Sequence, residues 1–441
     1  MYAILLPLFI SCMAVEVPGQ QPALPTRPTS LTTAFIGAHV IPIASAEIED
    51  GVVLIQDGKI TAVGSRGSIT IPDGSTLVDA RGRILMPGLV DTHSHVGGGW
   101  GADGSGPIQP DVSVFDAIDV RNTGFQRAQA GGITVANVMS GSGHLMSGKT
   151  AYLKLTDANT IDGWAVLDSA GHPMGGMKMA NGTNSRKDAP FPGTRGKSAA
   201  LVRKVFLDAQ AYQAKLDAAK TDPEKAPERD LGMEALIEVL EGKRIVHHHT
   251  HRHDDIMTVL RLREEFGFRV VLHHVSEAWK VADEIAAAGV GCSLILVDSP
   301  GGKLEARDIG FEAGGVLERA GGKVAFHTDD WITDSRHFLR MAALAVRAGM
   351  SREGALRALT LVPAGMLDLG DRIGSLEVGK DADIILLDGD PFSVYTKVQE
   401  TWVNGVRVFD RSNPEDLLFA TGGMGAGQSR AHTSCCDGEG N

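Results

Sequence analysis

The sequence predicts an α/β protein: a (β/α)8 TIM-like barrel with a small β-sandwich domain formed from both chain ends. About eight short apolar runs alternate with amphipathic helical patterns through the middle of the chain, as in parallel sheets joined by helices. Two β-rich segments bracket this region. A doubly wound open sheet is the alternative, but histidines and aspartates follow the apolar runs, where a barrel gathers its catalytic residues. Their position favours the barrel.

The small β domain is expected to comprise residues 33–84 and 371–410. In the first segment, strands at 52–56 and 60–63 flank Asp57-Gly58, and this dipeptide tolerates the positive φ angles of a tight hairpin turn. In the second, a strand at 382–387 precedes a hairpin around Asn404-Gly405. We therefore expect the two segments to form one domain.

The barrel is expected over residues 85–370. Its strand candidates are residues 84–91, 132–138, 164–168, 175–179, 244–249, 269–274, 290–297 and 323–329. Helical patterns lie between them: apolar side chains at Leu201, Val205, Ala209 and Tyr212 share one face, and a helix over 335–348 stops at Gly349. The alternation predicts eight buried strands, each followed by a helix.

The first 32 residues are expected to be a signal peptide and linker, because the apolar stretch 2–11 is too short to span a bilayer. Leu8-Phe9-Ile10-Ser11-Cys12 resembles a bacterial lipoprotein box with Cys12 as the lipidated residue, although no Lys or Arg precedes it. A disordered cytosolic extension is the alternative. We expect a periplasmic or secreted protein, with a flexible tail over 411–441.

Composition narrows the class of partner. Acidic residues outnumber basic ones by 54 to 42, the net charge is −12, and no basic cluster appears in the sequence. This balance argues against nucleic acid or an anionic membrane as a partner. Four cysteines, two of them adjacent in the C-terminal tail, provide neither a disulfide framework nor a cysteine zinc site. We expect an enzyme for a small-molecule substrate, without a membrane span and assembled as a homo-oligomer.

The most informative motif is Asp91-Thr92-His93-Ser94-His95, which directly follows an apolar run. Side chains alternate along a strand, so the two histidines project to the same side and provide two ligands for a zinc-type ion. Later strand candidates end in further histidines and aspartates: His247 to His253, His273 and His274, and His327 to Asp330. An ion held there would lower the pKa of bound water from about 15.7 towards ~7.

These motifs resemble the amidohydrolase superfamily, and in particular its imidazolonepropionase-like branch. The resemblance covers roughly residues 33–410 and rests on the segment from Met86 to His95 together with the closing segment from Gly374 to Asp383. It implies a metal-dependent barrel enzyme that holds one or two zinc-type ions.

The resemblance also implies roles for single residues. His93 and His95 match the paired ligands of strand one, His249 the strand-five ligand and His274 the strand-six ligand. Asp329 matches the aspartate that binds metal and accepts the proton of the attacking water.

Many binuclear members of the superfamily carry a bridging lysine carboxylated by CO2, and Lys178 is the candidate for it. The related branch often continues Gly-Glu-Asn, whereas this chain reads Gly182-Thr183-Asn184. Whether the site holds one or two ions therefore stays open, and an ordinary lysine at a loop edge is the alternative for Lys178.

Other residues are candidates for substrate contact. His251 lies on the same strand face as His249, and His144 and His172 lie in glycine-containing segments that resemble loops of the same branch. Arg252 could hold a substrate carboxylate, or pair with Asp254 or Asp255 instead.

The remaining histidines are assigned by alternation along the strands. His327 shares a strand face with Asp329 and is a pocket candidate, while His273 is expected to alternate away from His274 and pack against a helix. His247, His248, His251 and His253 could also form a metal-scavenging tract.

We therefore expect hydrolysis of a C–N bond, in an amide or cyclic amide, with Asp329 as base and then as acid. Pocket histidines such as His274 and His327 would assist catalysis by stabilising the developing oxyanion. An aminohydrolase is one alternative, but such enzymes usually follow the strand-five histidine with His-x-x-Glu, and Arg252 stands at that position here. A non-catalytic scaffold is the second alternative.

Overall fold

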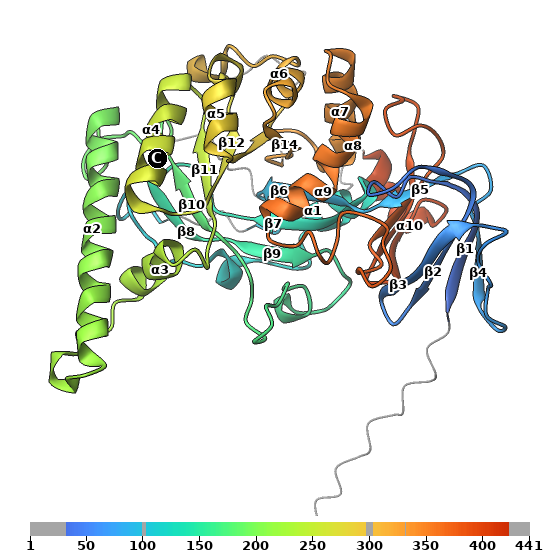
Figure 1. Ribbon diagram of the computed structural model, residues 1–441, viewed down its shortest axis with the longest axis horizontal. Helices are drawn as coiled ribbons and strands as arrows, with labels where there is room; N and C mark the ends of the chain where they lie inside the picture. The colour runs from blue at the N-terminus through green and yellow to red at the C-terminus, as the bar shows by residue number, and fades with distance from the viewer. Residues whose placement is uncertain (1–31, 99–102, 297–302, 331, 423–441) are drawn as a thin grey trace, which may run out of the picture.

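The computed structural model describes residues 32–98, 103–296, 303–330 and 332–422. A barrel surrounded by helices occupies most of the molecule, and a β-sheet lies at one end of it (Figure 1). The expected signal peptide and Cys12 lie outside the described residues. Within the described ranges, no helix combines the length and apolar character that crossing a bilayer requires.

The sheet at the end of the molecule has eight strands, which come from both ends of the described chain. Its order is β17-β16-β15-β5-β1-β2-β3, and β4 pairs with β1. The strands are β1 (Thr33–Val40), β2 (Ile48–Gln56), β3 (Lys59–Ser65), β4 (Thr76–Asp79), β5 (Ile84–Pro87), β15 (Ile384–Leu387), β16 (Val398–Val403) and β17 (Val406–Asp410). The strands form one sheet, so the expected sandwich is not confirmed.

The apolar run expected as a single strand over 84–91 is divided at Gly88. β5 pairs with β1 and β15 in the end sheet, whereas β6 (Leu89–Ser94) pairs with the barrel strand β7 (Ile133–Val138). A Cβ at Gly88 would clash with the side chain of Thr134. The barrel thus begins at β6 and not at residue 85, because the chain passes from one sheet to the other at this glycine.

The other barrel strands are β10 (Met177–Ala180), β11 (Val246–Thr250), β12 (Val270–His274), β13 (Gly291–Leu294) and β14 (Lys323–Phe326). These five strands pair in sequence order, and each pair is parallel. The last strand meets the first because the backbone N–H of Asp329 donates to the carbonyl of His93 over 2.9 Å. The fold is therefore a TIM-like barrel.

The third barrel position differs from the prediction. It is filled by β8 (Met146–Lys149) and β9 (Ala151–Lys154), and both strands run antiparallel to their barrel neighbours β10 and β7. The strand expected at 164–168 is wrong, since this segment forms only isolated bridges. Because β9 runs towards the N-terminal ends of the parallel strands, residues 155–176 lie at that end of the barrel.

Helices surround the barrel. They are α1 (Gly124–Ala130), α2 (Arg195–Ala219), α3 (Leu231–Leu240), α4 (His253–Phe266), α5 (Ala282–Ala288), α6 (Ala313–Arg319), α7 (Phe338–Arg347), α8 (Arg352–Leu359), α9 (Leu361–Met366) and α10 (Pro414–Thr421). Short 3-10 turns lie at Val114–Ala117, Ile161–Gly163, Pro223–Lys225, Ala278–Lys280, Leu304–Ala306 and Ser335–His337. The helix expected over 335–348 thus begins as a 3-10 turn and continues as α7.

Helix α10 lies within residues 411–441, which are expected to form a flexible tail. That expectation is wrong for the residues of the helix. Its N-terminus is stabilised by the Asn413 side chain, which accepts a hydrogen bond from the Glu415 N–H over 2.9 Å, and Pro414 occupies the first helical position. Phe419 and Ala420 pack against the main hydrophobic core. This apolar contact orders the segment.

Candidate metal centre

The ends of the first and last barrel strands bring two histidines and an aspartate together. His93 Nε2 and His95 Nε2 lie 3.3 Å apart, and Asp329 Oδ1 lies 3.3 Å from the first nitrogen and 2.8 Å from the second. Nitrogen and oxygen donors bound tetrahedrally to an ion at about 2.0–2.1 Å are separated by roughly 3.3 Å. These three atoms therefore already have the spacing of ligands around a single zinc-type ion.

Asp329 is suited to this position by its charge and its backbone. Burial alone would raise the pKa of its carboxyl, but the neighbouring His274 and His93 lower that pKa well below the usual range. The carboxylate is therefore ionised, as a metal ligand must be. Its φ angle is +48°, in the left-handed region that non-glycine residues seldom adopt, and such strain concentrates at functional sites.

A hydrogen bond on the side away from the centre fixes the orientation of the His95 ring. Its Nδ1 donates to the carbonyl oxygen of Met139 over 2.7 Å, so the Nε2 atom presents its lone pair to the centre. A histidine that ligates a metal is usually held by such a bond from its other nitrogen. The hydrogen bond thus selects the tautomer that a metal requires.

Lys178 reaches the same centre from β10. The side chain is fully buried, and its Nζ lies 3.1 Å from His93 Nε2 and 3.3 Å from the sulfur of Met139. It is not at a loop edge. Carboxylation would replace the buried ammonium with an anionic group that could bridge to a second set of donors.

The second set of donors comes from β11, β12 and the end of β14. The rings of His249 and His274 have centroids 4.3 Å apart, and His327 Nε2 lies 3.1 Å from His274 Nδ1. Ser293 Oγ holds the other ring nitrogen of His327 at 2.9 Å. Neither nitrogen of His249 has a hydrogen-bond partner among the described residues, and a buried polar group of this kind requires an explanation. A bound ion provides one.

His273 does not pack against a helix as expected. Its ring centroid lies 5.0 Å from that of His93, and its Nε2 lies 3.0 Å from His247 Nδ1. The prediction assumed strict alternation, but φ is +69° at His274 and +42° at Val275, so the strand ends there. Both histidines therefore face the barrel interior.

His247 extends this interior chain of histidines away from the centre. Its Nε2 lies 2.8 Å from the hydroxyl of Tyr152, and burial lowers the pKa of the His247 imidazole to about 3. The alternation that places His249 in the site also places His247 inside the barrel. The period of two along the strand therefore predicts this interior position of His247.

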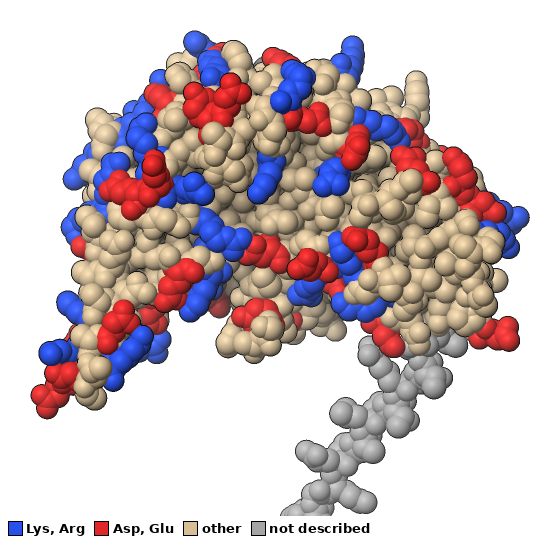
Figure 2. Space-filling model, in the orientation of Figure 1, with Lys and Arg blue, Asp and Glu red and all other residues tan. Residues whose placement is uncertain are grey.

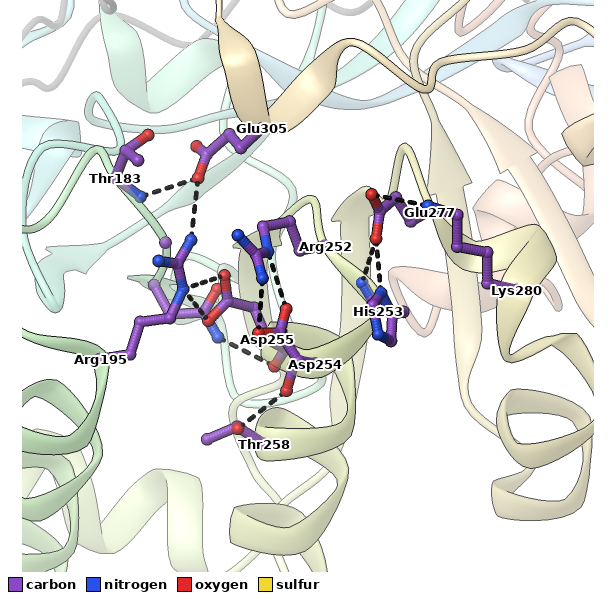
Figure 3. Close-up of polar contacts among 12 residues, drawn as sticks. Thr183, Arg195, Arg252, His253, Asp254, Asp255, Thr258, Glu277, Lys280 and Glu305 are labelled. Atoms are coloured by element: carbon purple, nitrogen blue, oxygen red, sulfur yellow. Dashed lines mark hydrogen bonds and ion pairs between the residues drawn. The ribbon is translucent and has the colours of Figure 1, made fainter.

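The positions of the neighbouring histidines do not favour the alternative of a metal-scavenging tract. The buried His248 bonds to the carbonyl of His249 at 2.9 Å. His253 begins α4, where its N–H and ring nitrogen both donate to Glu277, as Figure 3 shows. Neighbouring side chains along a strand point in opposite directions, so consecutive histidines cannot share one ion.

His251 lies beside the centre together with the carboxylate of Glu305, which no sequence pattern indicated. His249, His251 and Glu305 each offer a buried donor atom, and these atoms lie within 4.8 Å of one another. Burial lowers the pKa of His251 to about 3, so the ring is neutral. Glu305 lies in the loop after β13, a region where no strand pattern marks it.

Figure 3 shows how Glu305 is held. One carboxylate oxygen accepts a hydrogen bond from the Thr183 N–H over 2.8 Å and lies 3.7 Å from the Arg195 guanidinium, which pairs with Asp255 at 2.8 Å. The other oxygen, Oε1, has no hydrogen-bond partner in the described chain. It is thus available to a ligand beside His249 and His251.

Of three predicted substrate contacts, one lies elsewhere, one is already engaged and one remains available. His172 is 77% exposed and pairs with Asp168. Its assignment as a substrate contact is therefore wrong, because the antiparallel β9 carries its segment to the N-terminal end of the barrel. Arg252 makes two hydrogen bonds of 2.9 Å to Asp254, as Figure 3 shows. His144 is buried after β7, against the ring of Phe191 at 5.2 Å, with both ring nitrogens unpaired among the described residues.

Comparison with known proteins agrees with this geometry. Residues 207–409 match the profile of the amidohydrolase family. A crystal structure of an amidohydrolase from Thermotoga maritima MSB8 shares 33% sequence identity, covers 86% of this chain and 100% of its own, and superposes with a TM-score of 0.80. The chain belongs to the amidohydrolase family.

Two further relatives are more distant. Amidohydrolase tasK of Hapsidospora irregularis is 27% identical over 91% of this chain, which spans only 46% of the length of that relative. The imidazolonepropionase of Pseudomonas putida is 26% identical over 80% of this chain and 92% of its own length. This amidohydrolase is thus similar to imidazolonepropionase over most of its length. The superfamily is metal-dependent, and the donors at His93, His95 and Asp329 fit an ion.

Proposed function

We propose that this amidohydrolase is a metal-dependent hydrolase that cleaves a C–N bond, in an amide or cyclic amide of a small or peptide-like molecule. The observation that carries the proposal is the convergence of His93 Nε2, His95 Nε2 and Asp329 Oδ1 at 2.8–3.3 Å. Three buried donors at this spacing can hold one ion, and the site lies at the C-terminal ends of the barrel strands.

The ion we propose is zinc. His93, His95 and Asp329 would hold one ion, and Lys178, once carboxylated, would bridge to a second ion on His249 and His274. When bound, the metal supplies Lewis acidity, which acidifies a water molecule and polarises the substrate carbonyl. His93, His249 and His274 have pKa values well below the usual range because they are buried, so their neutral rings can bind metal.

Asp329 is the residue that moves the proton. Its Oδ1 faces the two histidines of β6, and its Oδ2 lies 3.8 Å from His274 Nδ1. We assign Oδ2 as the atom that accepts a proton from the attacking water and delivers it to the leaving nitrogen. An ionised carboxylate in a buried site suits general base catalysis.

Other side chains would orient the substrate and stabilise charge. His327, held through Ser293, would support the developing oxyanion. His251 and His144 are the proposed substrate contacts, because both are buried and present unpaired ring nitrogens. Arg252 is occupied by Asp254 and is not assigned to the substrate.

The test is to purify the protein without chelator, measure metal per chain, and assay N-acyl amino acids, dipeptides and cyclic amides. Release of a new carboxylate with a new amine supports amide hydrolysis. Release of ammonia from a ring amine supports the aminohydrolase alternative instead, in which Glu305, with a carboxylate oxygen within 4.8 Å of a His249 ring nitrogen, would be the candidate acid. Absence of bound metal after zinc addition would favour the scaffold alternative.

Export to the periplasm or medium remains a proposal based on residues 2–12. Expression of the full chain and its Cys12→Ser variant in a bacterium, with a labelled fatty acid, tests both parts. Label on the parent chain alone supports a lipoprotein. An unlabelled chain in the cytosolic fraction would exclude both export and lipidation.

A further inference from the structure

A cavity lies at the N-terminal end of the barrel, opposite the candidate metal centre. It has a volume of about 500 Å³ and is lined by residues that begin barrel strands, among them Ile245, Val270 and Gly291, and by residues of α9. Figure 1 shows α9 over this end of the barrel. Its side chains Val362 and Met366 pack on Ile245 and Val271, so the floor of the cavity is apolar.

The ionisable residues that line this cavity are all basic. They are Arg263 near the end of α4, Arg269 before β12, Lys323 at the start of β14 and Arg357 near the end of α8. Among the described residues, no aspartate or glutamate lines the cavity. In a protein with a net charge of −12, such a concentration of positive charge stands out. Figure 2 shows blue side chains around the centre of this face.

Three of these four cations lack an acidic partner. Arg269 pairs with Asp368 through hydrogen bonds of 2.7 and 2.5 Å. Within the described ranges, Arg263, Lys323 and Arg357 form no ion pair and no side-chain hydrogen bond. Arg263 and Arg357 are also half-buried, where like charges repel more strongly than in open water. An anion in the cavity would relieve that repulsion.

From this arrangement we propose that the cavity binds a small organic anion carrying two or more oxyanion groups, such as phosphates, on a partly apolar body. Guanidinium groups bind phosphate and carboxylate oxygens through paired N–H donors, and the apolar floor would accommodate the body of the ligand. A volume of this size suits a metabolite-sized molecule. The site is separate from the proposed hydrolysis and does not depend on it.

Two glycines give the cavity its space. A Cβ added at Gly365 or at Gly289 would meet no atom within 4 Å. Gly365 has no positive φ, so a larger side chain is compatible with its backbone. The Gly365→Leu variant would therefore fill the cavity with an apolar group and leave all four cations in place.

Calorimetric titration of the full chain with inorganic pyrophosphate at constant ionic strength tests the proposal. We expect saturable binding and a rise in Tm of roughly 2–4 °C at saturation. Arg357→Gln, Arg263→Gln and Gly365→Leu should each weaken binding at least about tenfold. The matched control is Arg261→Gln, on the same helix as Arg263 but exposed and bonded to Thr258, and it should bind like the parent.

Pyrophosphate also binds metal ions, so the Asp329→Asn variant is titrated in parallel. Binding that persists in Asp329→Asn and is lost in Gly365→Leu supports the cavity. Binding that is lost in Asp329→Asn and persists in Gly365→Leu would assign the anion to the metal centre and overturn the proposal. Absence of saturable binding, or equal weakening in Arg261→Gln, would overturn it as well. Far-UV circular dichroism establishes that each variant is folded.

Discussion

Asp329 Oδ1 lies 2.8 Å from His95 Nε2, which joins the end of the last barrel strand to the end of the first. The backbone reinforces this closure, because the Asp329 N–H donates to the carbonyl of His93. A residue that closes the barrel thus also completes the proposed ligand set. The fold and the metal centre share this contact.

The first prediction concerns Asp329. Asp329→Asn removes the ionised oxygen that we assign as ligand and base, and loss of a general base typically costs about 10²–10⁴-fold in rate. We expect a fall of that size in kcat, together with reduced metal per chain by elemental analysis. The control is Asp162→Asn, at an exposed residue in the segment at the N-terminal end of the barrel. Unchanged metal content and rate in Asp329→Asn would refute both assignments.

The second prediction concerns carboxylation of Lys178. Its Nζ lies 3.1 Å from His93 Nε2, so we expect a carbamate there that bridges two ions. Protein loaded with zinc and ¹³C-bicarbonate should show a carbamate resonance by NMR and close to two ions per chain. Lys178→Ala should lose the resonance and one ion, whereas Lys197→Ala, at an exposed position in α2, should retain both. A single ion per chain without a carbamate signal would indicate a mononuclear centre.

The third prediction is a dependence of stability on pH. Burial lowers the pKa of His247 from about 6.5 to about 3, so between these values the unfolded chain binds a proton that the folded chain does not. The free energy of unfolding must therefore fall as pH drops from 6.5 towards 3, by about 1.4 kcal/mol per pH unit for this group.

Urea unfolding of the metal-free protein at pH 6, 5 and 4 measures this dependence. His247→Gln retains a group that can hydrogen-bond to Tyr152 but cannot be protonated in this range. Its free energy of unfolding should fall less steeply with decreasing pH than that of the parent. The difference in slope should correspond to about one bound proton. Parallel curves for the two proteins would show that His247 titrates in the same way when folded and unfolded.

The fourth prediction concerns the glycine between the two sheets. A Cβ at Gly88 would clash with Thr134, so Gly88→Ala should force the strands apart and cost about 1–3 kcal/mol of stability. Gly67→Ala is the matched control, because a Cβ there would meet nothing within 4 Å. Thermal unfolding compares the two, and equal Tm values would show that the junction accommodates the added methyl group.

Local patterns in the sequence identified much of this arrangement. The period of two along a strand correctly placed His93 and His95 on one side, and runs of buried residues located β7, β10, β11, β12 and β13 to within a few residues. The resemblance to amidohydrolases identified the family. These features depend on residues adjacent in sequence, so the sequence expresses them directly.

Other features depend on contacts between distant segments. The direction of β9 is set by its pairing with β7, and that pairing removes His172 from the site. The left-handed backbone at His274 turns the His274 ring into the interior that His273 already faces, and Glu305 reaches His249 from a loop without a periodic pattern. The sequence by itself determined the family, the strand ends and the ligand types. Only the tertiary structure decided which side chains meet, because strand direction and positive φ angles are imposed by neighbours far away in the chain.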